Sequence, residues 1–149
     1  MQVREMTDQE VIDRFYEIWS DLEQPTIWKN TYFGIGTLQN PMDVWITMEI
    51  IWQVKPDFIV EAGTLQGGSA LLWATILAQV NPTGRVITID IRNTTTRAAA
   101  HDLWKKSIEF VSGSSTDPEV VSHVASQVKG KKVLVILDSL HTKEHVLDE

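Results

Sequence analysis

Acidic and hydroxyl side chains come directly after four apolar runs of the chain. Glu61 follows FIV, Asp90 follows RVITI, and Asp138 follows VLVIL. A Gly-Ser-Ser-Thr-Asp turn at 113–117 follows IEFVS. If these runs are parallel strands, their carboxyl ends meet at one edge of the sheet, where open α/β sheets bind ligands. Three carboxylates and a Gly/Ser turn at that edge predict one ligand-binding site.

The stretch IVEAGTLQGGSALLWA, residues 59–74, has the pattern of a strand, a glycine turn and a helix. A Walker A loop needs a lysine after its last glycine, and Ser69 stands there instead. A dinucleotide fingerprint needs a second glycine where the chain has Leu65. The loop therefore disfavours an ATPase or GTPase, and it disfavours an NAD-linked enzyme.

A third pattern fits this loop, namely an acid two residues before a G-x-x-x-G pair, formed by Glu61, Gly63 and Gly67. It is typical of loops that bind S-adenosylmethionine, whose ammonium and sulfonium groups favour a nearby carboxylate. We expect Glu61 to serve the amino-acid end of this cofactor, directly or through water. We expect Gly63 to permit a close approach of the backbone, and Asp90 to accept the ribose hydroxyls.

Each of these residues also has a purely structural interpretation. Glu61 can cap the next helix, and Asp90 can cap a turn. Asp117 precedes Pro118, so it is a good helix N-cap as well as a candidate contact to adenine. The arrangement as a whole, more than any one residue, favours a binding site.

The elements that must position these residues alternate regularly from Asp57 onward. Apolar strands alternating with helices predict an α/β fold with a parallel sheet covered on both faces. We expect strands at 57–60, 85–91, 108–113 and 131–139, with helices at 67–80, 95–106 and 118–129 and another starting near 141.

Upstream, a helix from Thr7 to Leu22 is predicted, with Thr7 and Glu10 forming a capping box. A second helix over 42–54 should begin after Asn40 and Pro41. Between them, the aromatic stretch 25–40 is expected to be irregular, because it contains Gly34 and Gly36. It either covers a site or packs the first helix against the core.

We interpret 1–149 as one domain, with an N-terminal appendage at 1–40 and a cofactor-binding core at 41–149.

Composition narrows the classes of function further. Of 149 residues, 43% are hydrophobic, so the chain can bury a core. The net charge of −7 disfavours nucleic acid as a partner. The absence of cysteine excludes disulfides and thiolate metal sites. There is no signal-peptide pattern and no apolar run long enough for a membrane span, so we expect a soluble, cytoplasmic protein.

Five stretches together resemble the cephalosporin hydroxylase family: QNPMDVW, EIIWQVKPDFIVEAGTLQGGSALLWA, VITIDI, GSSTD and VLVILDSLH. The resemblance covers Trp28 to the C-terminus. It implies the Rossmann-like, doubly wound parallel sheet of S-adenosylmethionine-dependent methyltransferases, here cut to the strand order 3-2-1-4. The predicted cofactor contacts are Glu61, Gly63, Thr64, Gly67, Ser69, Asp90, Ser114, Ser115 and Asp117.

The resemblance also implies that Asp138 is the first ligand of a Mg²⁺ site that orients an acceptor hydroxyl and lowers its pKa. His141 is a candidate general base, or else a packed or solvated histidine at a helix start. Members of the family continue for several more strands, and the next one completes the metal site. This chain ends at Glu149.

Two hypotheses follow. The chain is an O-methyltransferase acting on a small-molecule hydroxyl, or it is a catalytically incomplete, cofactor-binding or oligomerising form of that fold. Because the fourth strand is an apolar edge in the expected order, we also predict a homo-oligomer, joined through that edge.

Overall fold

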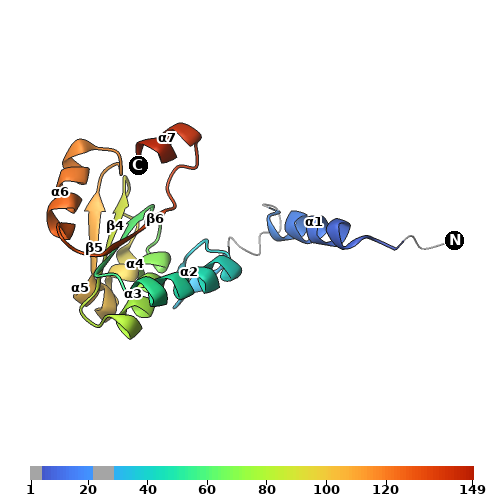
Figure 1. The fold of residues 1–149 in the computed structure, drawn as a ribbon, viewed down its shortest axis with the longest axis horizontal. Coiled ribbons are helices and arrows are strands. Elements are labelled where there is room, and N and C mark those ends of the chain that lie inside the picture. Colours follow the sequence, from blue (N-terminus) through green and yellow to red (C-terminus); the bar gives the residue numbers. More distant parts are fainter. Residues whose placement is uncertain (1–4, 22–28) are drawn as a thin grey trace.

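Four parallel strands form a sheet in the computed structural model, which describes residues 5–21 and 29–149. The spatial order is β5-β4-β3-β6, and each strand pairs in parallel with its neighbours (Figure 1). Counted along the chain, this is the predicted order 3-2-1-4, so the prediction is confirmed. The strands are β3 (Phe58–Ala62), β4 (Arg85–Asp90), β5 (Ile108–Ser112) and β6 (Val133–Leu137).

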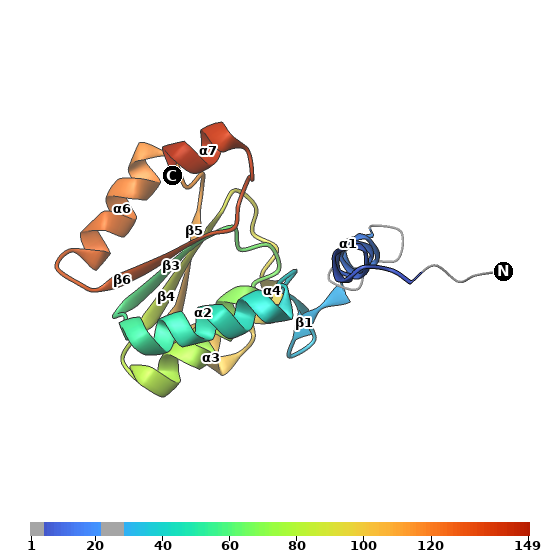
Figure 2. The ribbon, with the colours of Figure 1, turned by 45° about the vertical axis from the view of Figure 1, so that its right-hand side comes forward.

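Helices cover both faces of this sheet (Figure 2). On one face, α2 (Pro41–Val54), α3 (Gly68–Val80) and α5 (Asp102–Ser107) enclose the larger buried cluster, which includes Ile59 and Trp73. On the other face, α6 (Pro118–Val128) packs over Val60 and Ile87. Central strands buried on both faces must be continuously apolar, which is why these segments lack an alternating pattern.

The single helix predicted at 95–106 is wrong in detail, because α4 (Thr96–Ala99) ends before α5 begins. His101 between them has an extended backbone. Ala98 and Trp104 are both buried in the same cluster. On one continuous helix, residues six positions apart would lie about 120° apart around the axis. The break lets both side chains face the core.

Helix caps account for several element boundaries. Asn40 accepts a hydrogen bond from the Met42 amide, and Asp117 accepts one from the Glu119 amide. In α1 (Asp8–Trp19), Thr7 and Glu10 form the predicted capping box, while Leu22 lies outside the described residues. The last helix, α7 (Lys143–Asp148), begins after Thr142. No helix in the described part of the chain is long and apolar enough to cross a bilayer.

Part of the aromatic stretch 25–40 is regular, contrary to the prediction. A short antiparallel hairpin joins β1 (Thr31–Tyr32) to β2 (Ile35–Gly36). Phe33 and Gly34 have positive φ, as a tight hairpin turn requires, so a glycine here makes the strands possible. The hairpin lies against the start of α3, because a β-carbon on Gly68 would meet the carbonyl oxygens of β2. Residues 25–28 of the stretch lie outside the described residues.

Candidate functional site at the carboxyl edge of the sheet

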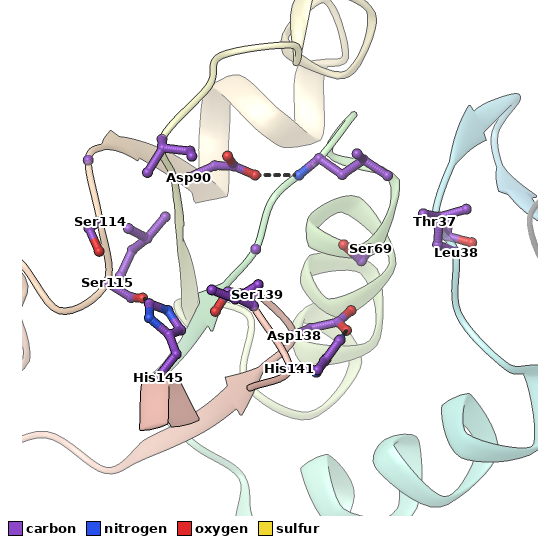
Figure 3. A pocket seen from close by; sticks show the side chains of 16 residues that line it. Thr37, Leu38, Ser69, Asp90, Ser114, Ser115, Asp138, Ser139, His141 and His145 are labelled. Atoms are coloured by element: carbon purple, nitrogen blue, oxygen red, sulfur yellow. Dashed lines mark hydrogen bonds and ion pairs between the residues drawn. The ribbon is translucent and has the colours of Figure 1, made fainter. Parts of the chain in front are cut away.

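A cavity of about 610 Å³ opens at the carboxyl ends of the four strands (Figure 3). Its size is within the range of small-molecule sites. Every strand-end loop contributes to it, and so does the segment before α2. It is lined by Thr37, Leu38, Gly63, Leu65, Ser69, Ile89, Asp90, Ile91, Gly113, Ser114, Ser115, Asp138, Ser139, Leu140, His141 and His145.

The glycines of the first loop are required by neighbouring protein segments. Gly63 has φ +97°, and a β-carbon on it would lie 2.0 Å from the carbonyl oxygen of Asp138. A β-carbon on Gly67 would lie 2.7 Å from the ring of Trp104. Gly63 still lines the cavity, whereas Gly67 does not. We predicted that Gly63 would let the backbone come close to a ligand. In the structure, the atoms that come close to Gly63 belong to the backbone of Asp138, at the end of β6.

Asp90 at the end of β4 holds this loop in place. Its Oδ2 accepts hydrogen bonds from the amides of Thr64 and Leu65, at 3.1 and 2.9 Å. Its Oδ1 accepts one from the Arg92 amide at 3.0 Å. Asp90 therefore caps a turn, as its structural interpretation predicted. It also lines the cavity, so it remains a candidate ligand contact. Leu65 has φ +48°, so the loop keeps a left-handed residue at the position where a dinucleotide fingerprint has glycine.

Glu61 lies behind the cavity wall and is fully buried. It accepts hydrogen bonds from Trp73 Nε1 at 2.8 Å and from Thr88 Oγ1 at 2.6 Å. Burial raises the pKa of Glu61 to about 7, although hydrogen bonds from Thr88, Ser69 and Trp73 oppose the rise, and the charge of Asp138 adds to it. Ser69 lines the cavity, so contact between Glu61 and a ligand would run through this hydroxyl.

Thr64, a predicted contact, is also directed away from the cavity. Its side chain is buried, and its hydroxyl lies 2.6 Å from that of Thr88. Because Thr88 donates to Glu61, the three side chains form a buried chain of hydrogen bonds between β3 and β4. This network fixes the strand ends from which the site is built.

The turn after β5 divides into two parts. Ser114 and Ser115, two of the residues predicted to contact a cofactor, line the cavity. Asp117 is not among the lining residues, and its carboxylate caps α6. The structural interpretation of Asp117 is therefore the one that the geometry supports.

Asp138 stands at the end of β6 with both oxygens near other side chains. Its Oδ2 accepts a hydrogen bond from Gln39 Nε2, and its Oδ1 lies 3.4 Å from His141 Nε2. Burial raises the pKa of Asp138, and the contacts with Gln39 and His141 partly oppose this. The His141 side chain is 71% exposed. A carboxylate beside an imidazole is one requirement of a general base with an orienting group.

The N-terminal segment supplies a wall of the cavity through residues that the sequence analysis did not single out. Thr37 and Leu38 line the cavity, and Gln39 holds Asp138. Asn30 donates a hydrogen bond to the Gln39 carbonyl and accepts one from the Thr37 amide. Of the two expectations for the stretch 25–40, covering a site is the one these contacts favour, and its aromatic residues were the only signal in the sequence.

Another group missed by sequence reasoning joins α7 to the sheet. Oε1 of Glu149 accepts hydrogen bonds from Ser115 and Ser139, and it lies 3.2 Å from His145 Nε2. Burial alone would raise the pKa of Glu149, but these hydroxyl and histidine contacts lower it. The contacts hold α7 against the turn after β5 and close that side of the cavity.

The predicted Mg²⁺ site is incomplete in the part of the chain described. No group of three histidine or acidic residues there gathers as metal ligands. Asp138 contributes one carboxylate, Asp90 is committed to backbone amides, and Glu61 is enclosed in the core. Mg²⁺ prefers six oxygen ligands, so these residues alone do not form its site.

Comparisons with known proteins agree with the predicted family. The model of the family described as "Rhamnosyl O-methyltransferase/CmcI" matches residues 25–149. Rhamnosyl O-methyltransferases of Mycobacterium bovis and Mycobacterium tuberculosis are 35% identical over 127 residues, which cover 83% of this chain and 51% of theirs. The Mycobacterium leprae protein of that name is 31% identical, with 54% of it covered. The chain thus spans about half the length of these relatives.

Solved structures show the same fold. A cmcI structure with Mg-SAM superposes with a TM-score of 0.67 at 19% identity, covering 98% of this chain and 60% of that one. A cmcI structure with SAH gives a TM-score of 0.63 at 20% identity, covering 99% and 69%. The four-stranded parallel sheet with its flanking helices is therefore the Rossmann-like fold of these proteins.

Proposed function

We propose, because the chain belongs to the rhamnosyl O-methyltransferase/CmcI family, that its cavity binds S-adenosylmethionine and that the chain transfers a methyl group to a small-molecule hydroxyl. The curated relatives carry the name of that activity, and solved members of the fold hold SAM or SAH. The observation that carries the proposal is the placement of Asp90, Ser114 and Ser115 around one cavity at the strand ends.

Asp90 has room for one ligand hydroxyl. A carboxylate accepts about four hydrogen bonds, and three backbone amides already use Asp90. The remaining position suits a ribose hydroxyl. Because the same carboxylate fixes the amides of Thr64 and Leu65, the loop is already ordered before a ligand arrives, which lowers the entropic cost of binding.

The rest of the cavity matches the other parts of the cofactor. Ile89 and Ile91 flank Asp90 with apolar surface, and Ser114 and Ser115 add hydroxyls suited to an adenine edge. Ser69, next to Glu61, suits the charged amino-acid end. S-adenosylmethionine would supply a methyl group on a positively charged sulfur.

The acceptor would lie between the end of β6 and the segment before α2. His141 is the candidate base for the acceptor hydroxyl proton, with Asp138 orienting its ring. Thr37 and Leu38 face this part of the cavity and would exclude water. Asp138 could also serve as one oxygen ligand of a Mg²⁺ ion, whose other ligands would be water, acceptor oxygens or groups beyond the described residues.

A second candidate function is a cofactor-binding form without turnover. It is favoured by the engagement of Asp90 with backbone amides and by the enclosure of Glu61 in the core, which leave Asp138 as the remaining carboxylate of the three for a metal ion. Cofactor binding and methyl transfer must therefore be measured separately.

Calorimetry of the full chain with S-adenosylmethionine tests the proposal. We expect saturable binding that Asp90→Asn weakens about tenfold or more, because the ribose contact and the loop both depend on this carboxylate. Asp117→Asn is the matched control and should bind within about twofold of the parent, since asparagine also caps a helix. No heat at millimolar cofactor would refute the proposal.

Mass spectrometry of polyhydroxylated acceptors, incubated with and without Mg²⁺, then separates the two candidates. Addition of one methyl group supports the transferase. Binding without such addition to any acceptor supports the form without turnover.

A further inference from the structure

Three polar side chains that line the cavity contact one and the same oxygen atom. They are Ser115 after β5, Ser139 after β6 and His145 on α7, and Figure 3 shows them close to one another. Oε1 of Glu149 accepts hydrogen bonds from the hydroxyls of Ser115 and Ser139, the second at 2.6 Å. His145 Nε2 lies 3.2 Å from this oxygen. The Glu149 side chain is only 2% exposed and does not line the cavity, so its contacts with the site run through these three groups.

Glu149 is ionised at neutral pH, which decides the direction of these hydrogen bonds. Burial raises the pKa of Glu149, but the hydrogen bonds from Ser115 and Ser139 and the neighbouring His145 lower it overall. An ionised carboxylate has no proton to donate and can only accept. The hydroxyl protons of both serines must therefore point at Glu149.

This direction leaves the two serines one role toward a ligand. A serine hydroxyl has one proton and two acceptor lone pairs. Because Glu149 takes both protons, Ser115 and Ser139 present only lone pairs to the cavity. His145 follows the same rule when its ring is neutral, since a proton on Nε2 faces the carboxylate and leaves Nδ1 as an acceptor. These three residues thus make one side of the cavity a set of hydrogen-bond acceptors.

The neighbouring hydroxyl of Ser114 is not restricted in this way. It lies 3.0 Å from the hydroxyl of Thr116 and accepts a hydrogen bond from the Thr116 amide at 3.3 Å. A threonine hydroxyl can donate or accept, so Ser114 keeps a proton that it can give to a ligand. Two adjacent serines of one turn therefore differ in what they offer, and contact with Glu149 makes the difference.

We propose that Glu149, acting through Ser115 and Ser139, makes the site select a nucleoside whose base carries an amino group over one with a carbonyl oxygen at that position. In adenine the amino group is the hydrogen-bond donor, whereas the ring nitrogens accept. The amino group can donate to the serine oxygens, but a carbonyl would bring lone pairs against lone pairs and leave both sides unpaired. The inference rests on the proposed binding of S-adenosylmethionine, and it makes Glu149 a positioning residue for the base.

Calorimetry with two ligands that differ at this group tests the role of Glu149. S-adenosylhomocysteine carries the amino group, and S-inosylhomocysteine has a carbonyl oxygen in its place. We expect the parent chain to bind the adenosyl ligand about tenfold or more tightly than the inosyl ligand. In Glu149→Met the serine hydroxyls can turn and donate to the carbonyl, so this ratio should fall to about threefold or less. A purely structural role of Glu149 would weaken both ligands equally and leave the ratio unchanged.

Three further variants complete the test. Glu149→Gln keeps the shape and one oxygen that accepts the serine protons, so its ratio should lie between those of the parent and Glu149→Met. Glu144→Met is the matched control, because Glu144 is an exposed acid on the same helix that does not line the cavity, and its ratio should equal that of the parent. If Glu149→Met fails to fold, Ser139→Ala decides, since it removes one acceptor from the cavity and should also lower the ratio.

The outcomes separate this inference from the proposed function. No binding of either ligand to the parent chain would refute cofactor binding and the role of Glu149 together. Binding of S-adenosylhomocysteine with a ratio that Glu149→Met leaves unchanged would refute the role of Glu149 alone. Equal affinity of the parent for the two ligands would also overturn that role.

Discussion

The side-chain amide of Gln39 donates a hydrogen bond to the carboxylate of Asp138, 99 residues away in the sequence. This contact joins the end of β6 to the segment before α2, whose Thr37 and Leu38 form one wall of the cavity. It holds one Asp138 oxygen, while the other lies near His141. The orientation of the candidate catalytic pair therefore depends on a residue from the N-terminal part of the chain.

Replacing Gln39 with leucine should lower turnover about tenfold or more, the usual size for partners that orient site groups. Cofactor affinity should stay within about twofold, because Gln39 does not line the cavity. Steady-state kinetics and calorimetry on the same preparation check both values. Gln66→Leu is the matched control, since Gln66 accepts from the Gly36 amide and anchors the same segment without touching Asp138. An equal loss of turnover in both variants would show a purely structural role.

Glu61→Gln should reduce the dependence of stability on pH. The pKa of Glu61 is about 7 in the folded protein, against an ordinary value of 4.5. Between these values the folded state binds more protons than the unfolded state, so the stability from this group is full below about pH 4.5 and is lost as pH rises through 7. The difference is on the order of 3 kcal/mol.

Urea denaturation from pH 5 to pH 8 measures this slope. In Glu61→Gln it should be smaller, and at pH 8 the variant should equal or exceed the parent in stability. Asp138, whose pKa is also raised, contributes a slope of the same sign. Glu109→Gln is the contrast. Burial tends to raise the pKa of Glu109, but its contacts with His123 and Gln127 and the charges of His123 and Arg85 lower it overall. The stability that Glu109 contributes is lost only as pH falls below about 4.5. The Glu109→Gln variant should therefore keep the slope of the parent protein from pH 5 to pH 8.

Gly63→Ala should be far more destabilising than Gly130→Ala. Both glycines have positive φ, so alanine brings backbone strain of about 1–2 kcal/mol at either position. At residue 63 the new β-carbon would also collide with the backbone of Asp138, whereas at residue 130 no atom lies within 4 Å. Thermal unfolding should show a modest loss for Gly130→Ala and loss of the folded state for Gly63→Ala. Similar melting temperatures would contradict the tight β3–β6 approach.

Local patterns were enough to predict the fold. The apolar runs at 58–62 and 85–90 predicted parallel strands, because both faces of such central strands are buried. Asn40 and Asp117 were identified as helix caps since a cap bonds an amide only two residues away. The same reasoning placed Asp90 and Asp138 at one edge of the sheet.

Local patterns also failed at identifiable points. One helix was predicted where α4 and α5 form, because only packing shows that Ala98 and Trp104 must both face the core. The glycines at 34 and 36 were taken as breaking regular structure, but Gly34 makes the hairpin turn and Gly36 ends its second strand. A turn glycine has the same appearance in a sequence whether or not strands flank it.

By itself the sequence determined the parallel strands, the helix caps and the edge at which the cavity lies, because these follow from periodicity and from contacts within a few residues. The strand order was implied by the resemblance to a known family. Only the tertiary structure decided that Glu61 lies behind the wall, that Gly63 faces Asp138, and that Gln39 holds that carboxylate. Such contacts join residues far apart in the chain, and they exist only after helices and strands have packed.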